Sequence, residues 1–256
     1  MVNEIFQKKI FDRVPVKHGK EMSDAVIIKY IQKKIQDLTR KGKIRVLDIG
    51  CGGGQLLETF TKTKYVEVYG LDISEKVLRI AKQKGYIVHK INLEKDKLPF
   101  SNEYFDIIVA NDLIEHLIDP DKVLTEIHRV SHSNTKIIIC VPNINSPISF
   151  FIQLFLDYPP LQSARYKSVH FRDYTLLLIK SVLIINAFQV EKVMGSYVYP
   201  IKSYLSQKIA HLFPRVSERL IVVCTKTKLP DIKINDVYFD TSELLNQVKK
   251  IENASK

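Results

Sequence analysis

A cluster of glycines directly after a strand-like segment is the feature that most constrains this chain. It lies in RVLDIGCGGGQLLETF, at 45–60, where the residues before the glycines are branched, apolar and nearly continuous, as in a strand buried on both faces. Four of the chain's nine glycines then follow within a few positions: Gly50, Gly52, Gly53 and Gly54. A helix-like pattern continues over about 55–63. A strand, a glycine turn and a helix in this order predict a ligand site lined by backbone at the carboxyl end of the strand.

The rest of the chain alternates between strand-like and helix-like segments. Helical spacing of apolar residues predicts helices over about 21–40, 75–85, 120–130 and 174–188. Strand-like runs cover 44–50, 66–74, 86–93, 105–112, 136–143, 189–196 and 219–226. Alternation of this kind predicts an α/β fold with a mostly parallel sheet and helices on both faces.

Composition narrows the class of protein. The chain has 256 residues with 45% hydrophobic content, enough for one sizeable core. No apolar run approaches the roughly 18 residues of a membrane-spanning helix, and the first residues lack the apolar core of a signal peptide. The three cysteines lie far apart, without the spacing of a disulfide framework or a zinc site. We therefore expect reduced thiols, no metal site and a cytoplasmic protein.

The net charge is +11, and much of the excess lies near the N-terminus. A basic region can attract phosphates, RNA or acidic lipids. Its lysines are spread out and carry few aromatic neighbours, a pattern that is also typical of a solvated helix face. Charge alone therefore leaves nucleic-acid binding open.

Two acids indicate which ligand the glycine turn takes. A dinucleotide site needs the pattern G-x-G-x-x-G, and Gln55 stands where the third glycine is required. Asp48, just before the turn, would repel a pyrophosphate but suits a ligand with a cationic amino-acid tail. Asp72, at the end of the next strand, can accept hydrogen bonds from both ribose hydroxyls. The alternative role for Asp72 is to cap the helix that follows, a position that Ser74 also suits.

Five segments in register resemble the class I S-adenosylmethionine-dependent methyltransferases. They are VLDIGCGGG (46–54), GLDIS (70–74), INLEKDKLPF (91–100), FDIIVANDLIEHLIDP (105–120) and IIICVPN (137–143). The resemblance covers about residues 44–226. It implies a Rossmann-like, doubly wound, seven-stranded mixed sheet with helices on both faces, in which the last strand is antiparallel and lies between the fifth and the sixth.

The same resemblance implies S-adenosylmethionine as the cofactor and nine residues that contact it. The methionine end takes the glycine turn, the ribose and adenine take the ends of the second and third strands, and the sulfonium faces the end of the fourth. In that order the residues are Asp48, Gly50, Cys51, Gly52, Asp72, Ile73, Asn92, Leu93 and Asn111. Many relatives have Asp in place of Asn92, whose amide oxygen can still accept a hydrogen bond from an adenine amino group. We expect Cys51 to fill space rather than act as a nucleophile.

Methyl transfer needs a general base only when the acceptor must lose a proton. His116, beside Glu115, is the base in some relatives, and the alternative is that this pair only braces the glycine turn. His170, in VHFRDYT, is the second candidate, and its alternative is to hold its own loop in place. Arg172 could pair with an acidic acceptor or with a carboxylate on the sheet.

The segment outside the alternation sets the expected domain organisation and acceptor. We expect a basic helical extension at 1–43, a cofactor-binding domain at 44–228 and a polar tail at 229–256. Within the domain, the apolar residues of 144–172 form either an acceptor-side lid, a contact between two copies of the chain, or core. The resemblance favours methylation of a small-molecule, glycan or lipid-linked acceptor at oxygen. An RNA methyltransferase is the alternative, although ANDL stands where an Asn-Pro-Pro-Tyr motif would be needed.

Overall fold

The computed structural model of the chain describes residues 22–38, 42–156, 170–198 and 204–228. Most of the expected basic extension, part of the expected lid and the expected polar tail lie outside these residues. None of the helices that the structure describes is long and apolar enough to cross a membrane.

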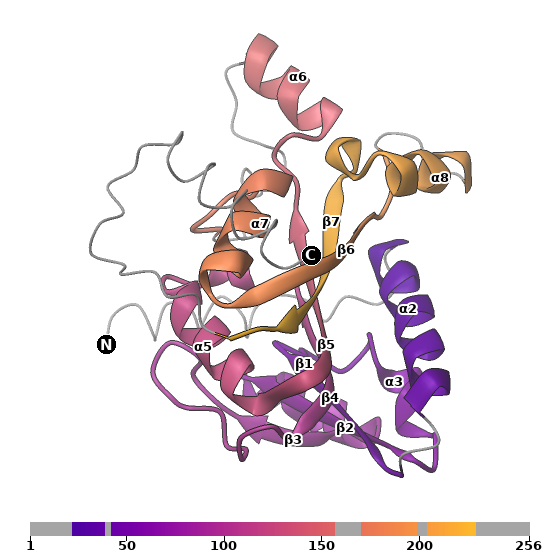
Figure 1. The fold of residues 1–256 in the computed structure, drawn as a ribbon, viewed down its shortest axis with the longest axis vertical. Helices are drawn as coiled ribbons and strands as arrows, with labels where there is room; N and C mark the ends of the chain where they lie inside the picture. The colour runs from indigo at the N-terminus through magenta and orange to yellow at the C-terminus, as the bar shows by residue number, and fades with distance from the viewer. Residues whose placement is uncertain (1–21, 39–41, 157–169, 199–203, 229–256) are drawn as a thin grey trace.

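Seven strands form one mixed sheet in the order β3-β2-β1-β4-β5-β7-β6 (Figure 1). Strands β1 to β5 are parallel to one another, while β7 runs antiparallel to both β5 and β6. The seven-stranded Rossmann-like fold, with its last strand inserted antiparallel, is therefore confirmed. The strand bounds are β1 Ile44–Ile49, β2 Val66–Asp72, β3 Ile87–Lys90, β4 Phe105–Asn111, β5 Ser131–Pro142, β6 Phe188–Gly195 and β7 Arg219–Lys226.

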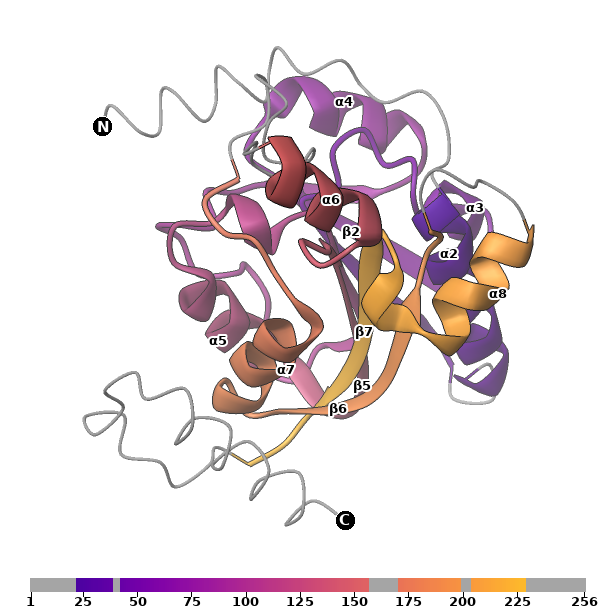
Figure 2. The same cartoon turned by 90° about the horizontal axis from the view of Figure 1, so that it is seen from above.

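Helices cover both faces of the sheet, each packed on its own hydrophobic cluster (Figures 1 and 2). One cluster lies under α2, α3 and α4, and the other lies under α5 and α7. The described helices are α2 Met22–Leu38, α3 Glu58–Thr61, α4 Glu75–Gln83, α5 Pro120–Val130, α6 Pro147–Leu156, α7 Leu176–Ile185 and α8 Tyr204–Leu212, with the short 3₁₀ helices η2 Ile114–His116 and η3 Pro214–Val216.

Helix α2 belongs to the core of the domain, although its residues fall in the expected N-terminal extension. Ile27 and Ile31 are fully buried, in the same cluster as Val46 of β1 and Ile221 of β7. Ala25 of the same helix is exposed. The described part of the extension is therefore a layer of the α/β domain.

The helix expected at 55–63 is much shorter than the sequence pattern predicts. Only α3, at Glu58–Thr61, is helical. Gly54 has a φ of +70°, outside the helical region, and the amide of Leu57 donates to the hydroxyl of Tyr86 (2.9 Å) rather than joining a helix. The glycine turn thus runs on as irregular backbone, and the start of α3 is not part of it.

The carboxyl ends of β2, β1 and β4 lie side by side because these strands are neighbours in the sheet. Asp48 and Ile49 of β1 pair with Gly70 and Leu71 of β2. On its other side, Ile49 pairs with Ala110 of β4. The glycine turn, Asp72 and Asn111 therefore meet at one edge of the sheet, where open α/β folds bind their ligands.

Candidate functional site

The glycine turn is tied to the end of β2 through its backbone. The amides of Gly50 and Cys51 both donate to the carbonyl oxygen of Leu71, at 2.8 and 2.9 Å. The amide of Gly52 donates to Oδ2 of Asp72 at 3.0 Å. Two neighbouring strand ends thus form one unit, joined by hydrogen bonds from three successive backbone amides.

Gly52 leaves bare backbone at the surface of this unit. Its φ is +51°, a left-handed conformation that favours glycine, and a Cβ placed there would meet nothing within 4 Å. By contrast, a Cβ on Gly50 would lie 3.0 Å from Cδ1 of Leu113. Open space beside Gly52 fits the close approach of a bulky ligand to the backbone.

Asp72 bridges the glycine turn and the start of α4. Besides Gly52, it accepts from the amide of Ser74 at Oδ1 (2.8 Å). A carboxylate oxygen can accept more than one hydrogen bond, so these contacts do not exclude a role for Asp72 toward ribose hydroxyls. The structure thus supports the helix-start role and remains compatible with the cofactor role.

Asp48 is a buried acid beneath the turn, with 2% of its surface exposed. The hydroxyl of Tyr86 donates to its Oδ2 at 3.2 Å. Burial raises the pKa of Asp48 to about 7, and the Tyr86 hydrogen bond offsets only part of that rise. A cation bound near this carboxylate would therefore favour its charged form.

The exit of β3 lies against the end of β2, because the amide of Ile91 donates to the carbonyl of Asp72 (3.0 Å). Oδ1 of Asn92 accepts from the amide of Glu94 at 3.0 Å, which leaves one lone pair on that oxygen. Leu93 and Ile73 are half-buried, and Leu93 packs against the core cluster. These three residues are within the same edge of the sheet as Asp72.

Asn111 and Cys51 complete the expected cofactor set. Asn111 is the last residue of β4, and its buried Oδ1 has no hydrogen-bond partner in the described part of the chain. A buried acceptor of this kind fits a ligand with an N–H donor. Burial raises the pKa of the Cys51 thiol, which supports the view that Cys51 fills space.

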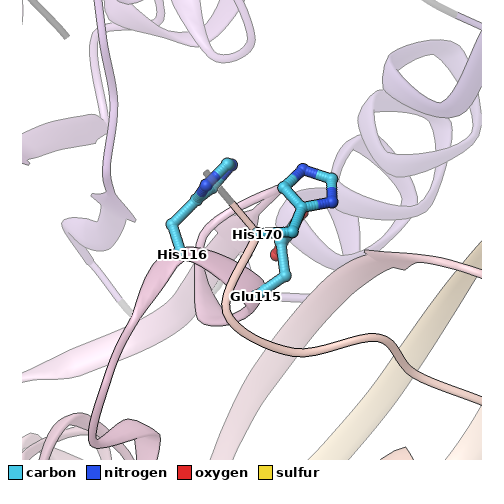
Figure 3. Close-up of side chains that lie close together, drawn as sticks. All are labelled: Glu115, His116 and His170. Carbon is cyan, nitrogen blue, oxygen red and sulfur yellow. The ribbon is translucent and has the colours of Figure 1, made fainter. Parts of the chain in front are cut away.

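Glu115, His116 and His170 come together just beyond β4, from two segments that are distant in sequence (Figure 3). The two imidazole rings lie edge to face, with centroids 4.7 Å apart. The carbonyl of Glu115 accepts from the amide of Phe171 (2.8 Å) and so fixes the chain next to His170. Both expected base candidates, His116 of η2 and His170, therefore lie in one cluster.

His170 is neutral at ordinary pH. The pKa of His170 is lowered to about 4, mainly by burial and secondly by the charge of His116. Its Nδ1 is buried and has no hydrogen-bond partner among the residues described. A histidine with so low a pKa is a weak proton acceptor, which favours His116 as the base of the pair.

The same cluster has the composition of a metal site. Its possible ligand atoms all lie within 4.8 Å of one another. Two imidazoles and a carboxylate form a donor set that suits zinc or iron. The arrangement can thus serve proton transfer or hold a cation, and only the first of these was expected from the sequence.

Two charged side chains beside the cluster are engaged elsewhere. Asp112, with a φ of +52°, pairs with Arg219 of β7. Arg172 donates from Nη2 to the carbonyl of Ile118 (2.9 Å), a partner other than the acidic acceptor or sheet carboxylate considered from the sequence. Both side chains hold the loops around the cluster.

Tyr86 and Leu113 are site residues that sequence reasoning missed. Tyr86 holds Asp48 and packs beside Gly54, while Leu113 covers Gly50. The position of Tyr86 immediately after Gly85, at a strand start, is an ordinary one, so no pattern singled it out. Leu113 lies within the segment 105–120, where an apolar residue has no feature that distinguishes it from a core residue.

A profile of the methyltransferase domain family matches residues 47–139. The mitochondrial ubiquinone biosynthesis O-methyltransferase of Saccharomyces cerevisiae is 30% identical over 173 residues, which are 63% of this chain and 55% of that protein. The ubiquinone biosynthesis O-methyltransferase of Coxiella burnetii is 37% identical over 103 residues, which are 39% of this chain and 42% of that protein. The chain thus spans about half the length of these curated relatives.

Solved structures support the same fold. A SAM-dependent methyltransferase from Thermotoga maritima superimposes with a TM-score of 0.57 and 18% identity, over 89% of this chain and 96% of that one. At this identity the likeness shows the fold alone. Together with the matched family profile and the strand order of the sheet, it leads to one assignment: residues 47–139 match the methyltransferase domain family, and the sheet that contains them has the fold of class I, S-adenosylmethionine-dependent methyltransferases.

Proposed function

We propose that this protein transfers the methyl group of S-adenosylmethionine to an oxygen atom of a small-molecule acceptor. The observation that carries the proposal is the pairing of His116 with the neutral His170 just past the end of β4. A hydroxyl acceptor must lose its proton during transfer, and an imidazole at this edge of the sheet can take it. The relatives named above, which are O-methyltransferases, support the choice of oxygen and of a small acceptor.

The residues at the strand ends fit the cofactor. Open space at Gly52 admits a nucleoside, and the unpartnered Oδ1 of Asn111 offers an acceptor for the amino group of the methionine end. Asp48 would provide the negative charge near that amino group, and Asp72 would accept from the ribose hydroxyls. Asn92 would accept from the adenine amino group, with Ile73 and Leu93 against the ring.

The bound cofactor supplies a methyl group activated by positively charged sulfur. The protein then has to align the acceptor oxygen with that methyl group and exclude water. His116 accepts the acceptor's proton. His170 stays neutral and keeps the ring of His116 in place through the edge-to-face contact. Glu115 holds the segment that carries His170.

A transfer assay tests this proposal. The full chain would be incubated with methyl-labelled S-adenosylmethionine and a panel of hydroxylated aromatic acceptors, each paired with its O-methylated and amino analogues. We expect label transfer to at least one free hydroxyl and none to its O-methylated analogue. Transfer only to amines, or only to RNA in a parallel reaction, would contradict the proposal.

A further inference from the structure

Helix α6 exposes four large apolar side chains at the carboxyl-end edge of the sheet. Phe150, Phe151, Leu154 and Phe155 have 57%, 55%, 61% and 69% of their surface exposed. The rings of Phe151 and Phe155 stack with centroids 5.6 Å apart, and the ring centroids of Phe150 and Phe151 are 6.4 Å apart. A helix of a soluble domain normally turns such residues inward, so this outward face needs an explanation.

Helix α8 has the same inverted pattern. Its buried residues include the small Ser206 and Ala210, whereas Leu205 and Leu212 are 65% and 75% exposed and Phe213 is 64% exposed. The packing of α8 on β6 explains the small inner face. A Cβ placed on Gly195 of β6 would lie 2.3 Å from the carbonyl oxygen of Ala210, so the helix backbone is very close to the strand. The large side chains are left on the outer side.

Helices α6 and α8 lie at the same end of the molecule (Figure 1). Asn143, at the exit of β5 before α6, donates from Nδ2 to the carbonyls of Arg215 and Ser217, which follow α8, at 2.9 and 2.8 Å. The two helices are thus held by one hydrogen-bonded junction. We refer to the exposed apolar side chains of α6 and α8, with Phe213, as the apolar rim.

In the two described segments that carry the apolar rim, the charged side chains are of one sign. Residues 144–156 and 204–217 contain no Asp or Glu. Lys208 and Arg215 are exposed, and His211 lies beside them in the sequence and is exposed as well. Exposed large apolar groups interleaved with cations are typical of surfaces that bind the interface of an anionic bilayer.

We propose that the apolar rim is a docking surface for an anionic lipid bilayer. Apolar side chains of α6 and α8 enter the interface, and the positive charges of Lys208 and Arg215 attract lipid phosphates. A second copy of this chain is a poorer occupant, because a two-fold contact through this face brings the same cations together. The proposal concerns binding alone and does not depend on methyl transfer.

Vesicle co-sedimentation of the full chain tests it. We expect binding to vesicles of phosphatidylcholine with about one third phosphatidylglycerol, and at least tenfold weaker binding to phosphatidylcholine alone, since counter-charged lipid supplies the attraction. The double variant Phe151→Ser, Phe155→Ser and the double variant Lys208→Gln, Arg215→Gln should each bind anionic vesicles at least tenfold more weakly. The matched control is Leu177→Ser, Leu178→Ser on α7, where 50% and 42% exposed leucines lie outside the rim.

Three outcomes would overturn the docking proposal. They are no binding of the wild-type chain to anionic vesicles, an equal loss in the α7 control, and a wild-type dimer that the rim variants convert to monomer. Retained affinity for S-adenosylmethionine in each variant shows that it is folded. Because lipid binding and cofactor binding are measured separately, the failure of one leaves the other standing.

Discussion

The two halves of the site are built in different ways. On the cofactor side, strand ends and the glycine turn are joined by backbone hydrogen bonds to Leu71 and Asp72. On the proposed acceptor side, the amides of Phe171 and Arg172 join the chain after His170 to the carbonyl of Glu115, and α6 exposes its phenylalanines. A site of the first kind keeps its geometry before ligand binding, whereas the second can vary without loss of the fold. We therefore expect substitutions to be tolerated less well on the proposed cofactor side than on the proposed acceptor side.

The largest expected effect is that of His116→Ala, which should impair methyl transfer without impairing cofactor binding. We expect His116→Ala to lower kcat for a hydroxyl acceptor by roughly 10²- to 10⁴-fold, because proton removal is lost, with unchanged affinity for S-adenosylmethionine. Steady-state kinetics and calorimetry on the same preparation measure both. His132→Ala is the matched control, since His132 lies beside Asp106 near the amino end of β4. A chelator that removes activity, with recovery on adding Zn²⁺, would contradict a simple base and assign the cluster to a metal.

A loss of cofactor affinity should follow from Asp72→Ala. A charge-assisted hydrogen bond contributes about 1.5–3 kcal/mol, so we expect roughly 10- to 100-fold weaker binding in calorimetry. Asp106→Ala is the control because Asp106 also accepts from a backbone amide, that of Arg45 (2.8 Å), at the opposite edge of the sheet. Equal losses in the two variants would show that Asp72 acts only through the fold.

The sequence predicted where the glycine turn and Asp72 lie in the fold, because the signals there are local. A strand, positive-φ glycines and an acid at the next strand end are each fixed by backbone geometry, so the motif determined where Gly52 and Asp72 lie. The predicted length of α3 was wrong, because the amide of Leu57 donates a hydrogen bond to the hydroxyl of Tyr86, a residue far away in the sequence. The contact between His116 and His170 joins residues that are far apart in the sequence. The sequence therefore identified them only as two separate candidates. The apolar pattern of α6 suits a buried helix equally well. It therefore does not reveal that Phe150, Phe151 and Phe155 are exposed.

The pH dependence of cofactor binding should show that Asp48 is on the cofactor side. Its pKa is raised to about 7, so the acid is increasingly neutral below that pH. If the bound ammonium requires the charged form, affinity should fall roughly fivefold from pH 7 to pH 6. Calorimetry over pH 5.5–7 should then show this slope for the wild type and a flat, weaker profile for Asp48→Asn. A slope retained in Asp48→Asn would exclude this residue as its cause.

The raised pKa of Asp48 also has a consequence for folding. A folded-state pKa above the unfolded value contributes stability at low pH, and that contribution is lost as the pH rises through about 7. Asp48→Asn should therefore remove a decrease in the free energy of unfolding between about pH 4 and pH 7. Urea denaturation at several pH values measures it, and a wild-type stability that rises steadily over this range with the same slope in the variant would contradict the assignment.

The smallest expected effect comes from a pair of glycines. Gly52 and Gly42 both have positive φ, +51° and +98°, and neither Cβ would meet an atom within 4 Å. Alanine at either position should cost about 1–2 kcal/mol in the free energy of unfolding, the left-handed strain of an L-residue. Only Gly52→Ala should weaken cofactor binding, by several-fold, since only there does the bare backbone face the ligand. Equal affinities in the two variants would remove Gly52 from the site.

Isothermal titration of the wild-type chain with S-adenosylmethionine tests the central claim most directly, because it needs no knowledge of the acceptor. The cofactor side, with its paired backbone and its open position at Gly52, predicts one saturable site per chain and a matching rise in thermal unfolding temperature. S-adenosylhomocysteine should compete for the same site. The absence of both heat and thermal shift at millimolar ligand would contradict the account.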